Sequence, residues 1–231
     1  MVLNESRYAN EGEVGMMSKD LWGRLAETYE VDHTLISGAD LVSAIQSELR
    51  GAVPAGEVVE LGCGTGLYTR AYAPSAALVT ATDKSAPMLR RAERSLADLP
   101  NVIVKFADAM ATGLPGESAD AVVAVNLLHI VPDAAGVLAE IRRLLRPGGT
   151  AILVDATSEK LTAKQMLISM WRIVRRWGLI REKGQQDLTQ AGLESLTREA
   201  GFDGIQGRLL TGSSMNAAFV RAVKPGGRTA A

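Results

Sequence analysis

The sequence predicts an α/β protein with a doubly wound, seven-stranded sheet, mostly parallel, whose last strand is antiparallel. Five short apolar runs, rich in β-branched residues or alanine, alternate with helical patterns between residues 55 and 155. Two further strand-like runs, near 204–211 and 215–223, close the chain. Each of the five runs is too short for a typical helix, so we interpret it as a strand buried on both faces.

The elements follow one another in a regular order. The five parallel strands are expected at GEVVELG (56–62), AALVTATD (76–83), NVIVKFAD (101–108), DAVVAVNLL (120–128) and GTAILVD (149–155). Helices are expected at 18–30, 39–50, 66–74, 85–97, 133–146 and 160–182, and from Thr189 to a stop at Gly201. The link ATGLPGES carries two glycines and a proline, so little helix is expected there.

Length and composition fit one ordinary globular domain, with 47% hydrophobic and 22% charged residues. We expect a disordered leader at 1–17 and a single domain at 18–231, with 158–186 as an insert that covers the substrate. The N-terminus has no apolar signal core, and the single cysteine excludes an internal disulfide, so a reducing cytoplasm is expected. The net charge of -1 argues against a nucleic-acid partner, and the two histidines argue against a metal site. The oligomeric state stays open.

The first apolar run passes into a glycine-rich turn, Glu60-Leu61-Gly62-Cys63-Gly64-Thr65-Gly66. Glycine permits positive φ and lets a ligand approach the backbone, and free amides at a helix start suit an anionic group. A dinucleotide fingerprint requires another glycine at the position of Leu67, so the glycines here stand in an every-other pattern instead. The turn alone predicts a nucleotide-like ligand without deciding which.

Two acidic residues end the strands that neighbour this turn. Asp83 ends the second strand, where a carboxylate can accept hydrogen bonds from ribose hydroxyls. Asp108 ends the third, where an acid can accept from an adenine amine while the Ala109 amide reaches a ring nitrogen. The structural alternative is that both acids only cap the segments that follow them. Together with Glu60 they converge on one crevice at the carboxyl ends of the strands.

With these residues in place, the chain resembles the class I S-adenosylmethionine-dependent methyltransferases of the type 11 group, which contains the ubiquinone and menaquinone biosynthesis enzymes. The matching segments are VVELGCGTGLYT, ATDKSAPMLRRAE, FADAMATGLP, DAVVAVNLLHIVPD and IRRLLRPGGT. The resemblance covers roughly 18–225. It implies S-adenosyl-L-methionine as cofactor and S-adenosyl-L-homocysteine as product.

The resemblance also implies roles for the residues of the turn. Glu60 would organise the methionine amine of the cofactor, and Gly62 and Gly64 would face its amino-acid part. Asp83 would hold the ribose. The same cofactor-binding site is expected to include the rest of the turn, Cys63, Thr65 and Gly66.

Five more residues are implied at the adenine and methionine ends of the cofactor. Lys84 and Met88 would flank adenine with their aliphatic parts, and Asp108 with Ala109 would read its edge. The carbonyl of Asn126 would meet the methionine amine.

One histidine is a candidate for the chemistry. Methyl transfer from a sulfonium is an in-line displacement, so the protein mainly aligns the nucleophile and excludes water. His129, four residues after the fourth strand, could act as a base on a phenol or enol; alternatively it only hydrogen-bonds the backbone. Tyr29 holds the position of an aromatic folded over the cofactor in the resembling family, or simply packs an amphipathic helix. We expect His33 to be an exposed loop residue.

A metal-dependent mechanism is not expected. It would need acids at the ends of the fourth and fifth strands, where Asn126 and Asp155 stand.

The insert after the fifth strand carries an apolar helical face and a basic remainder. The apolar residues are Met166, Leu167, Met170, Trp171, Val174 and Trp177, and the basic ones are Lys164, Arg172, Arg175 and Arg176. One interpretation is a core helix, and another is peripheral contact with a membrane surface. We expect a lid in which four of these residues line the substrate, namely Met166, Met170, Trp171 and Trp177.

These observations favour methylation of a small, rather apolar molecule, phenolic or quinone-like acceptors included, at oxygen, carbon or nitrogen. The Asn126-Leu127-Leu128-His129 segment lacks the Asn/Asp-Pro-Pro-aromatic sequence of base-amino methyltransferases. One alternative is a NAD-type oxidoreductase, which Leu67 and the closing strand pair disfavour. A second is a non-catalytic member of the fold that binds the cofactor.

Overall fold

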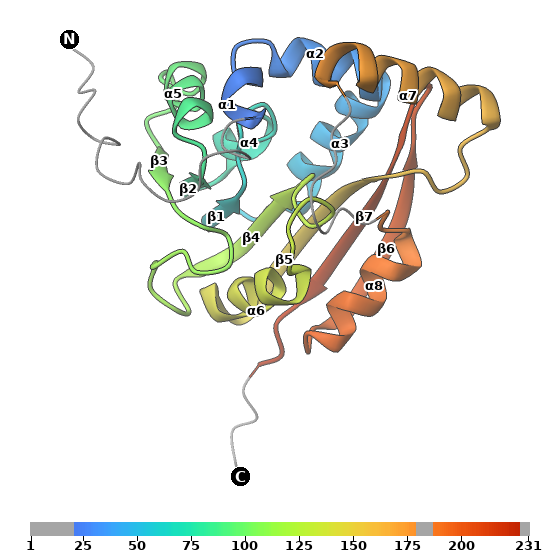
Figure 1. Ribbon diagram of the computed structural model, residues 1–231. Helices are drawn as coiled ribbons and strands as arrows, with labels where there is room; N and C mark the ends of the chain where they lie inside the picture. Colours follow the sequence, from blue (N-terminus) through green and yellow to red (C-terminus); the bar gives the residue numbers. More distant parts are fainter. Residues whose placement is uncertain (1–20, 179–186, 227–231) are drawn as a thin grey trace.

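A seven-stranded sheet forms the centre of the computed structural model, which describes residues 21–178 and 187–226 (Figure 1). The strands are β1 (Glu57–Leu61), β2 (Leu78–Asp83), β3 (Val102–Phe106), β4 (Ala119–Val125), β5 (Leu145–Thr157), β6 (Asp203–Thr211) and β7 (Asn216–Val223). Their order in the sheet is β3-β2-β1-β4-β5-β7-β6. Only β7 is antiparallel, to both β5 and β6. The predicted fold class is therefore confirmed.

Helices cover the sheet and one of its ends. They are α1 (Leu21–Leu25), α2 (Tyr29–Ser37), α3 (Ala39–Ala52), α4 (Thr69–Tyr72), α5 (Ala86–Ser95), α6 (Ala134–Leu144), α7 (Ala163–Trp177) and α8 (Gln190–Glu199), with a short 3-10 turn, η2 (Ala73–Ser75). The link between β3 and β4 holds no helix, as its glycines and proline predict.

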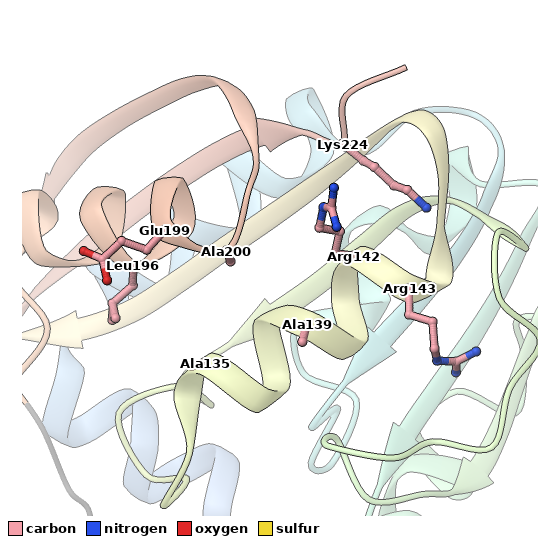
Figure 2. Close-up of a pocket in the computed structure, with 8 residues that line it drawn as sticks. All are labelled: Ala135, Ala139, Arg142, Arg143, Leu196, Glu199, Ala200 and Lys224. Atoms are coloured by element: carbon pink, nitrogen blue, oxygen red, sulfur yellow. The ribbon is translucent and has the colours of Figure 1, made fainter. Parts of the chain in front are cut away.

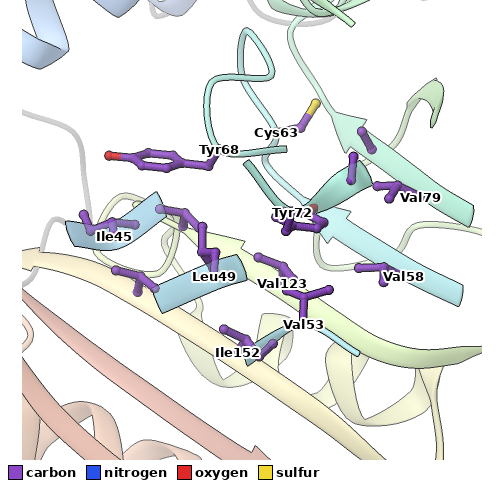
Figure 3. Packing of buried hydrophobic residues seen from close by; sticks show 14 of the residues in the cluster. Ile45, Leu49, Val53, Val58, Cys63, Tyr68, Tyr72, Val79, Val123 and Ile152 are labelled. Carbon is purple, nitrogen blue, oxygen red and sulfur yellow. The ribbon is translucent and has the colours of Figure 1, made fainter. Parts of the chain in front are cut away.

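The alternation of side chains along the strands creates two hydrophobic cores. On one face Val58, Val123 and Ile152 pack with α3, α4 and α5, and Figure 3 shows them beside Ile45 and Leu49 of α3. The other face packs against α6 and α8, in a cluster that includes Val59, Val122, Leu138, Ile141, Leu193 and Phe202. Because the central strands are buried on both faces, their sequences are continuous apolar runs.

Three expected helices differ from the structure. The helix expected at 160–182 is shorter, because α7 begins at Ala163 and ends at Trp177. The segment 18–30 does not form one helix: α1 ends at Leu25, and α2 begins at Tyr29 and runs on to Ser37, through His33, which was expected in a loop. The helix expected at 66–74 is reduced to α4 and η2, because Gly66 is still part of the turn, with a φ of 86°.

The fifth strand is longer than its apolar run. It starts at Leu145 instead of 149, because Leu145 pairs with Ala119 before the register shifts. From Thr150 to Thr157 it also pairs with β7.

The helix α7 has a complete N-terminal capping box. The Thr162 hydroxyl accepts from the Gln165 amide, and the Gln165 side chain accepts from the Thr162 amide. The helix ends before Gly178, whose φ is 79°. The expected leader at 1–17 and residues 179–186 of the expected insert lie outside the described residues. Within the described ranges, no helix is both long and apolar enough to cross a membrane.

Candidate functional site

The glycine turn after β1 is held in a conformation that only glycine adopts readily. Gly62, Gly64 and Gly66 have φ angles of 72°, 54° and 86°. The amide of Cys63 donates to the carbonyl of Thr82 at 2.8 Å, which ties the turn to β2. Each glycine of the every-other pattern thus stands at a position of the turn with positive φ.

Open space lies in front of Gly64. A Cβ atom placed there would meet no atom within 4 Å, whereas one at Gly66 would lie 2.8 Å from Leu96. Nearby, the buried hydroxyls of Thr65 and Ser85 have no hydrogen-bond partner among the described residues. Buried polar groups are normally satisfied, so an open backbone beside unpartnered hydroxyls fits a polar ligand.

Asp83 lies against this turn at the end of β2. Its Oδ2 accepts from the Gly64 amide at 2.9 Å, and its Oδ1 accepts from the Ser85 amide at 2.8 Å. Burial raises the pKa of Asp83, while the two amides and the charge of Lys84 partly offset the rise. Each carboxylate oxygen keeps acceptor capacity for a further hydrogen bond.

Glu60 is buried inside β1, directly behind the turn. Its Oε2 accepts from the Thr69 hydroxyl at 2.5 Å and from the Tyr72 hydroxyl at 2.8 Å. Burial raises the pKa of Glu60 to about 7; the two hydroxyls lower it, and the charge of Asp83 raises it further. Burial also raises the pKa of the neighbouring Cys63 thiol, so this cysteine is not a reactive thiolate.

The residues expected around adenine lie in different environments. Asp108 is exposed, and its Oδ1 accepts from the Met110 amide at 2.9 Å, so the capping alternative is present in the structure. Ala109 is half-buried, Lys84 is exposed, and Met88 is buried in α5. Their roles toward a cofactor stay predictions.

Asn126 follows β4 with a left-handed backbone, at a φ of 54°. Its amide donates to the Val154 carbonyl at 2.7 Å, and its side-chain Oδ1 accepts from the Ala156 amide at 3.1 Å. Its side chain also hydrogen-bonds Tyr68. A strained non-glycine residue fixed this firmly at the carboxyl end of a central strand is typical of a functional position.

His129 forms a close pair with Asp155, which sequence reasoning considered only as a metal ligand. The imidazole Nδ1 lies 2.5 Å from Asp155 Oδ1, and the amide of Leu128 donates to Oδ2 at 3.2 Å. Asp155 is fully buried. Because a carboxylate can only accept, Nδ1 carries the proton in the neutral imidazole and Nε2 is left as the basic nitrogen.

The sequence offered one signal for this pair. It predicts Asn126 and Asp155 at the ends of the fourth and fifth strands, which are neighbours in the sheet. His129 follows β4 closely enough for its ring to reach Asp155 on β5.

Aromatic rings from three parts of the chain meet beside the turn. Tyr29 stacks on His33, with ring centroids 5.5 Å apart, and on Trp177 of α7, at 5.9 Å. Trp22 of α1 meets both Tyr29 and Trp177 edge-on. Burial and then the charge of Asp83 raise the pKa of Tyr29, which shows that this ring lies near the ribose-holding candidate.

The expectation of an exposed His33 is wrong. His33 lies in α2, is 5% exposed, and its Nε2 is 2.8 Å from the Tyr68 hydroxyl. Burial and then the charge of His129 lower the pKa of His33 to about 4. The contact with Tyr68 spans 35 residues, so no local pattern could reveal it.

Of the four residues expected to line the substrate, the structure brings only Trp177 to the aromatic cluster. Met166, Met170 and Trp171 are 43%, 58% and 60% exposed on α7. Their contact with a substrate stays a prediction. The interpretation of the segment as a core helix is wrong, since Ser169 alone among the residues of α7 is buried.

A groove of about 430 Å³ lies between α6 and α8 (Figure 2). It extends from Ala135 to Arg142 of α6 and to Lys224 after β7. Because Lys224 lies where the parallel strands begin, this groove is at the opposite end of the sheet from the glycine turn. In the described part of the chain, no group of three His, Cys, Asp or Glu side chains could hold a metal ion.

Comparison with known proteins gives a consistent result. A family described as methyltransferase domain matches residues 59–153. The demethylmenaquinone methyltransferase of Clavibacter sepedonicus is 32% identical over 229 residues, which cover 91% of this chain and 91% of that protein. An uncharacterized methyltransferase of Mycobacterium tuberculosis is 35% identical over 125 residues, 53% of this chain and 63% of the relative. The chain thus spans less than two thirds of that second relative.

A solved structure shows the same fold. The phosphoethanolamine N-methyltransferase 2 of Haemonchus contortus, in complex with phosphomonomethylethanolamine and S-adenosylhomocysteine, has a TM-score of 0.65 at 19% identity. The match covers 88% of this chain and 58% of that one. The chain belongs to the methyltransferase domain family, and the demethylmenaquinone methyltransferase is a relative along nearly its whole length.

Proposed function

We propose that this protein transfers the methyl group of S-adenosylmethionine to a small, rather apolar acceptor. Membership of the methyltransferase domain family supports methyl transfer as the reaction, and the geometry of the glycine turn supports S-adenosylmethionine as the cofactor. The open backbone at Gly64, the fixed carboxylate of Asp83 and the unpartnered hydroxyls of Thr65 and Ser85 fit a polar, adenosine-containing group. The bound cofactor would supply an activated methyl group on a sulfonium.

The residues of the turn and the neighbouring strand ends would hold this cofactor. Asp83 would accept from the ribose hydroxyls, and Gly62 and Gly64 would allow its amino-acid part to approach the backbone. Asn126 and Glu60 would lie at the methionine end, and Tyr29 would cover the site together with Trp177. The remaining proposed cofactor contacts are Cys63, Thr65, Gly66, Lys84, Met88, Asp108 and Ala109.

The observation that carries the catalytic proposal is the pair of His129 and Asp155. With Nδ1–H donating to Asp155, the Nε2 atom of His129 can take a proton from an acceptor hydroxyl, amine or acidic carbon. The buried carboxylate then stabilises the imidazolium that forms. Asp155 is the positioning residue, and His129 is the proposed base.

An apolar acceptor is supported by the aromatic cluster, of which His33 lies close enough to His129 for the charge of His129 to lower its pKa. The aromatic cluster of Trp22, Tyr29, His33 and Trp177 supplies large, weakly polar surfaces. His33 is neutral at pH 7 because its pKa is about 4, so the cluster adds no positive charge near the acceptor. Phenolic and quinol-like molecules combine an apolar ring with a proton that a base can remove.

The test uses methyl-labelled S-adenosylmethionine with a panel of phenols, quinols and amines. We expect transfer to an apolar member of the panel. His129→Ala should leave the affinity for S-adenosylhomocysteine unchanged and lower kcat by about 10²- to 10⁴-fold. Asp155→Asn should lower kcat as well and shift its pH profile, because the amide can stabilise the other tautomer.

Two results would count against this proposal in different ways. An unchanged kcat for His129→Ala across a pH series would remove the role of the base. Proven cofactor binding without transfer to any member of the panel would favour a non-catalytic member of the fold.

A further inference from the structure

The helix α7 docks onto the protein through its polar side. The Ser169 hydroxyl donates to the Ser214 carbonyl at 2.7 Å, and Arg172 donates to the Ser214 hydroxyl at 2.7 Å. Arg176 pairs with the buried Asp32 at 3.3 Å. On the apolar side, Trp177 at the end of α7 packs against Tyr29 and Trp22. The apolar residues that precede it on this side are exposed in the described part of the chain.

The exposed part of this side is a continuous apolar stripe. It consists of Met166, Leu167, Met170, Trp171 and Val174, which are 43%, 70%, 58%, 60% and 43% exposed. At 100° per residue these side chains occupy an arc of about 140°. Figure 1 shows α7 along the outside of the molecule, beside α2. Exposed apolar surface gathered on one helix indicates an interaction site.

The charge of α7 differs from that of the chain. The helix carries four cationic side chains and no acidic one, in a protein of net charge -1. Lys164 and Arg175 follow directly on the Trp171 edge of the stripe by helical angle. The Arg175 guanidinium lies over the Trp171 ring, 5.4 Å from its centroid. An apolar stripe with a cationic border and a tryptophan at the boundary is typical of a helix lying in a membrane interface.

The docked side of α7 faces α2. A groove of about 690 Å³ separates the two helices, and Arg172 and Arg176 line one side of it. Val31 and Leu35 line the other and are 67% and 39% exposed. Val31 and Leu35 thus lie across the groove from the docked side of α7.

We propose that the α7 stripe and its cationic border bind the surface of a membrane that contains anionic lipids. The apolar side chains would enter the acyl boundary, while Lys164 and Arg175 extend to lipid phosphates. A second copy of the chain fits less well, because a two-fold interface on this stripe would bring the bordering cations Lys164 and Arg175 of one α7 toward the same two cations of the other. The proposal is independent of the acceptor, since lipid binding needs neither cofactor nor catalysis.

The test is sedimentation of the full-length protein with phosphatidylcholine vesicles, with and without phosphatidylglycerol. We expect binding to the anionic vesicles, a blue shift of tryptophan fluorescence that Trp171→Phe reduces, and weaker binding in high salt. Lys164→Ala combined with Arg175→Ala should weaken binding about 30-fold, at about fivefold for each charge. Leu167→Glu combined with Val174→Glu should abolish it.

Matched controls come from β3, the edge strand on the opposite side of the sheet from β6. Ile103 is 51% exposed and Lys105 is exposed, so Ile103→Glu and Lys105→Ala change similar groups away from α7 and should leave vesicle binding unchanged. Unaltered affinity for S-adenosylhomocysteine shows that each variant is folded. Absence of vesicle binding, equal binding to neutral vesicles, or binding unaffected by the α7 variants would overturn the proposal. A dimer in sedimentation equilibrium that Leu167→Glu dissociates, without vesicle binding, would assign the stripe to a second copy instead.

Discussion

Replacing Glu60 with glutamine should change how stability depends on pH. Glu60 is 1% exposed, and its pKa is raised from 4.5 to about 7 mainly by burial. In the folded protein it therefore keeps its proton between about pH 4.5 and 7, where the unfolded chain releases it. The stability that this proton contributes is complete below pH 4.5 and is lost as the pH rises through about 7.

The magnitude follows from the size of this change. A pKa raised from 4.5 to about 7 corresponds to a loss of about 3 kcal/mol in the free energy of unfolding. Glutamine has no proton to lose, and its side-chain oxygen can still accept from the hydroxyls of Thr69 and Tyr72. Relative to the wild type, Glu60→Gln should therefore gain about 3 kcal/mol between pH 4.5 and pH 8.

Urea unfolding of the cofactor-free protein at several pH values measures this difference. A loss of packing in the variant would lower its free energy of unfolding by the same amount at every pH. The change of the difference between variant and wild type with pH would stay the same. Glu199→Gln, at an exposed position on α8, is the matched control and should follow the wild type. Parallel curves for the wild type and Glu60→Gln would refute the reasoning, because they would mean that Glu60 ionises as easily in the folded protein as in the unfolded chain.

Three further predictions concern the same region. Asp83→Ala should weaken S-adenosylhomocysteine binding by about 1–3 kcal/mol, measured by calorimetry, through the loss of hydrogen bonds to a carboxylate; unchanged affinity would exclude a ribose contact. Gly64→Ala should lower stability by about 1–2 kcal/mol because of its positive φ and should also weaken cofactor binding. Gly113→Ala, at an equally open position with a φ of 67°, should lower stability without weakening cofactor binding. Equal cofactor affinity in the two variants would contradict a cofactor contact at Gly64. The wild type should lose about 3 kcal/mol in the free energy of unfolding as the pH falls from about 6.5 to about 4, because the unfolded chain protonates His33 in this range while the folded protein does not. His33→Gln should remove this loss. Denaturant titrations at both pH values should show the wild type and the variant diverging, and parallel behaviour would contradict the lowered pKa.

The sheet could be predicted because its signal is local. Each central strand is buried on both faces and therefore forms an uninterrupted apolar run, and each glycine-rich or polar link marks its end. The antiparallel position of β7 followed from the closing strand pair. The helix α2 was missed, because its β-branched residues Val31, Thr34 and Ile36 are poor helix formers and only packing stabilises them there.

The site could be predicted only in part. The proximity of the glycine turn and Asp83 could be predicted because both stand at the ends of neighbouring strands; their role toward a cofactor stays a prediction. His129 and Asp155 lie 26 residues apart in the sequence, and they meet only because β4 and β5 are neighbours in the sheet. His33 was placed wrongly for the same reason, since its burial depends on Tyr68.

The helix α7 shows a different limit. Its pattern correctly predicted an amphipathic helix, but a pattern does not say which side faces the protein. The usual expectation is that the apolar side packs inward. Here Ser169, Arg172 and Arg176 make polar contacts with the rest of the protein. Of the apolar side, Trp177 packs against Tyr29, while the stripe from Met166 to Val174 stays exposed.

The central claim is that the glycine turn of this methyltransferase binds an S-adenosylmethionine-type cofactor. Calorimetric titration of the wild-type protein with S-adenosylhomocysteine and, separately, with NADH tests it most directly. The open backbone at Gly64 and the carboxylate of Asp83 predict saturable binding of S-adenosylhomocysteine. Leu67 stands where a dinucleotide site requires glycine, so no saturable binding of NADH is expected. Saturable binding of NADH with none of S-adenosylhomocysteine would contradict the account.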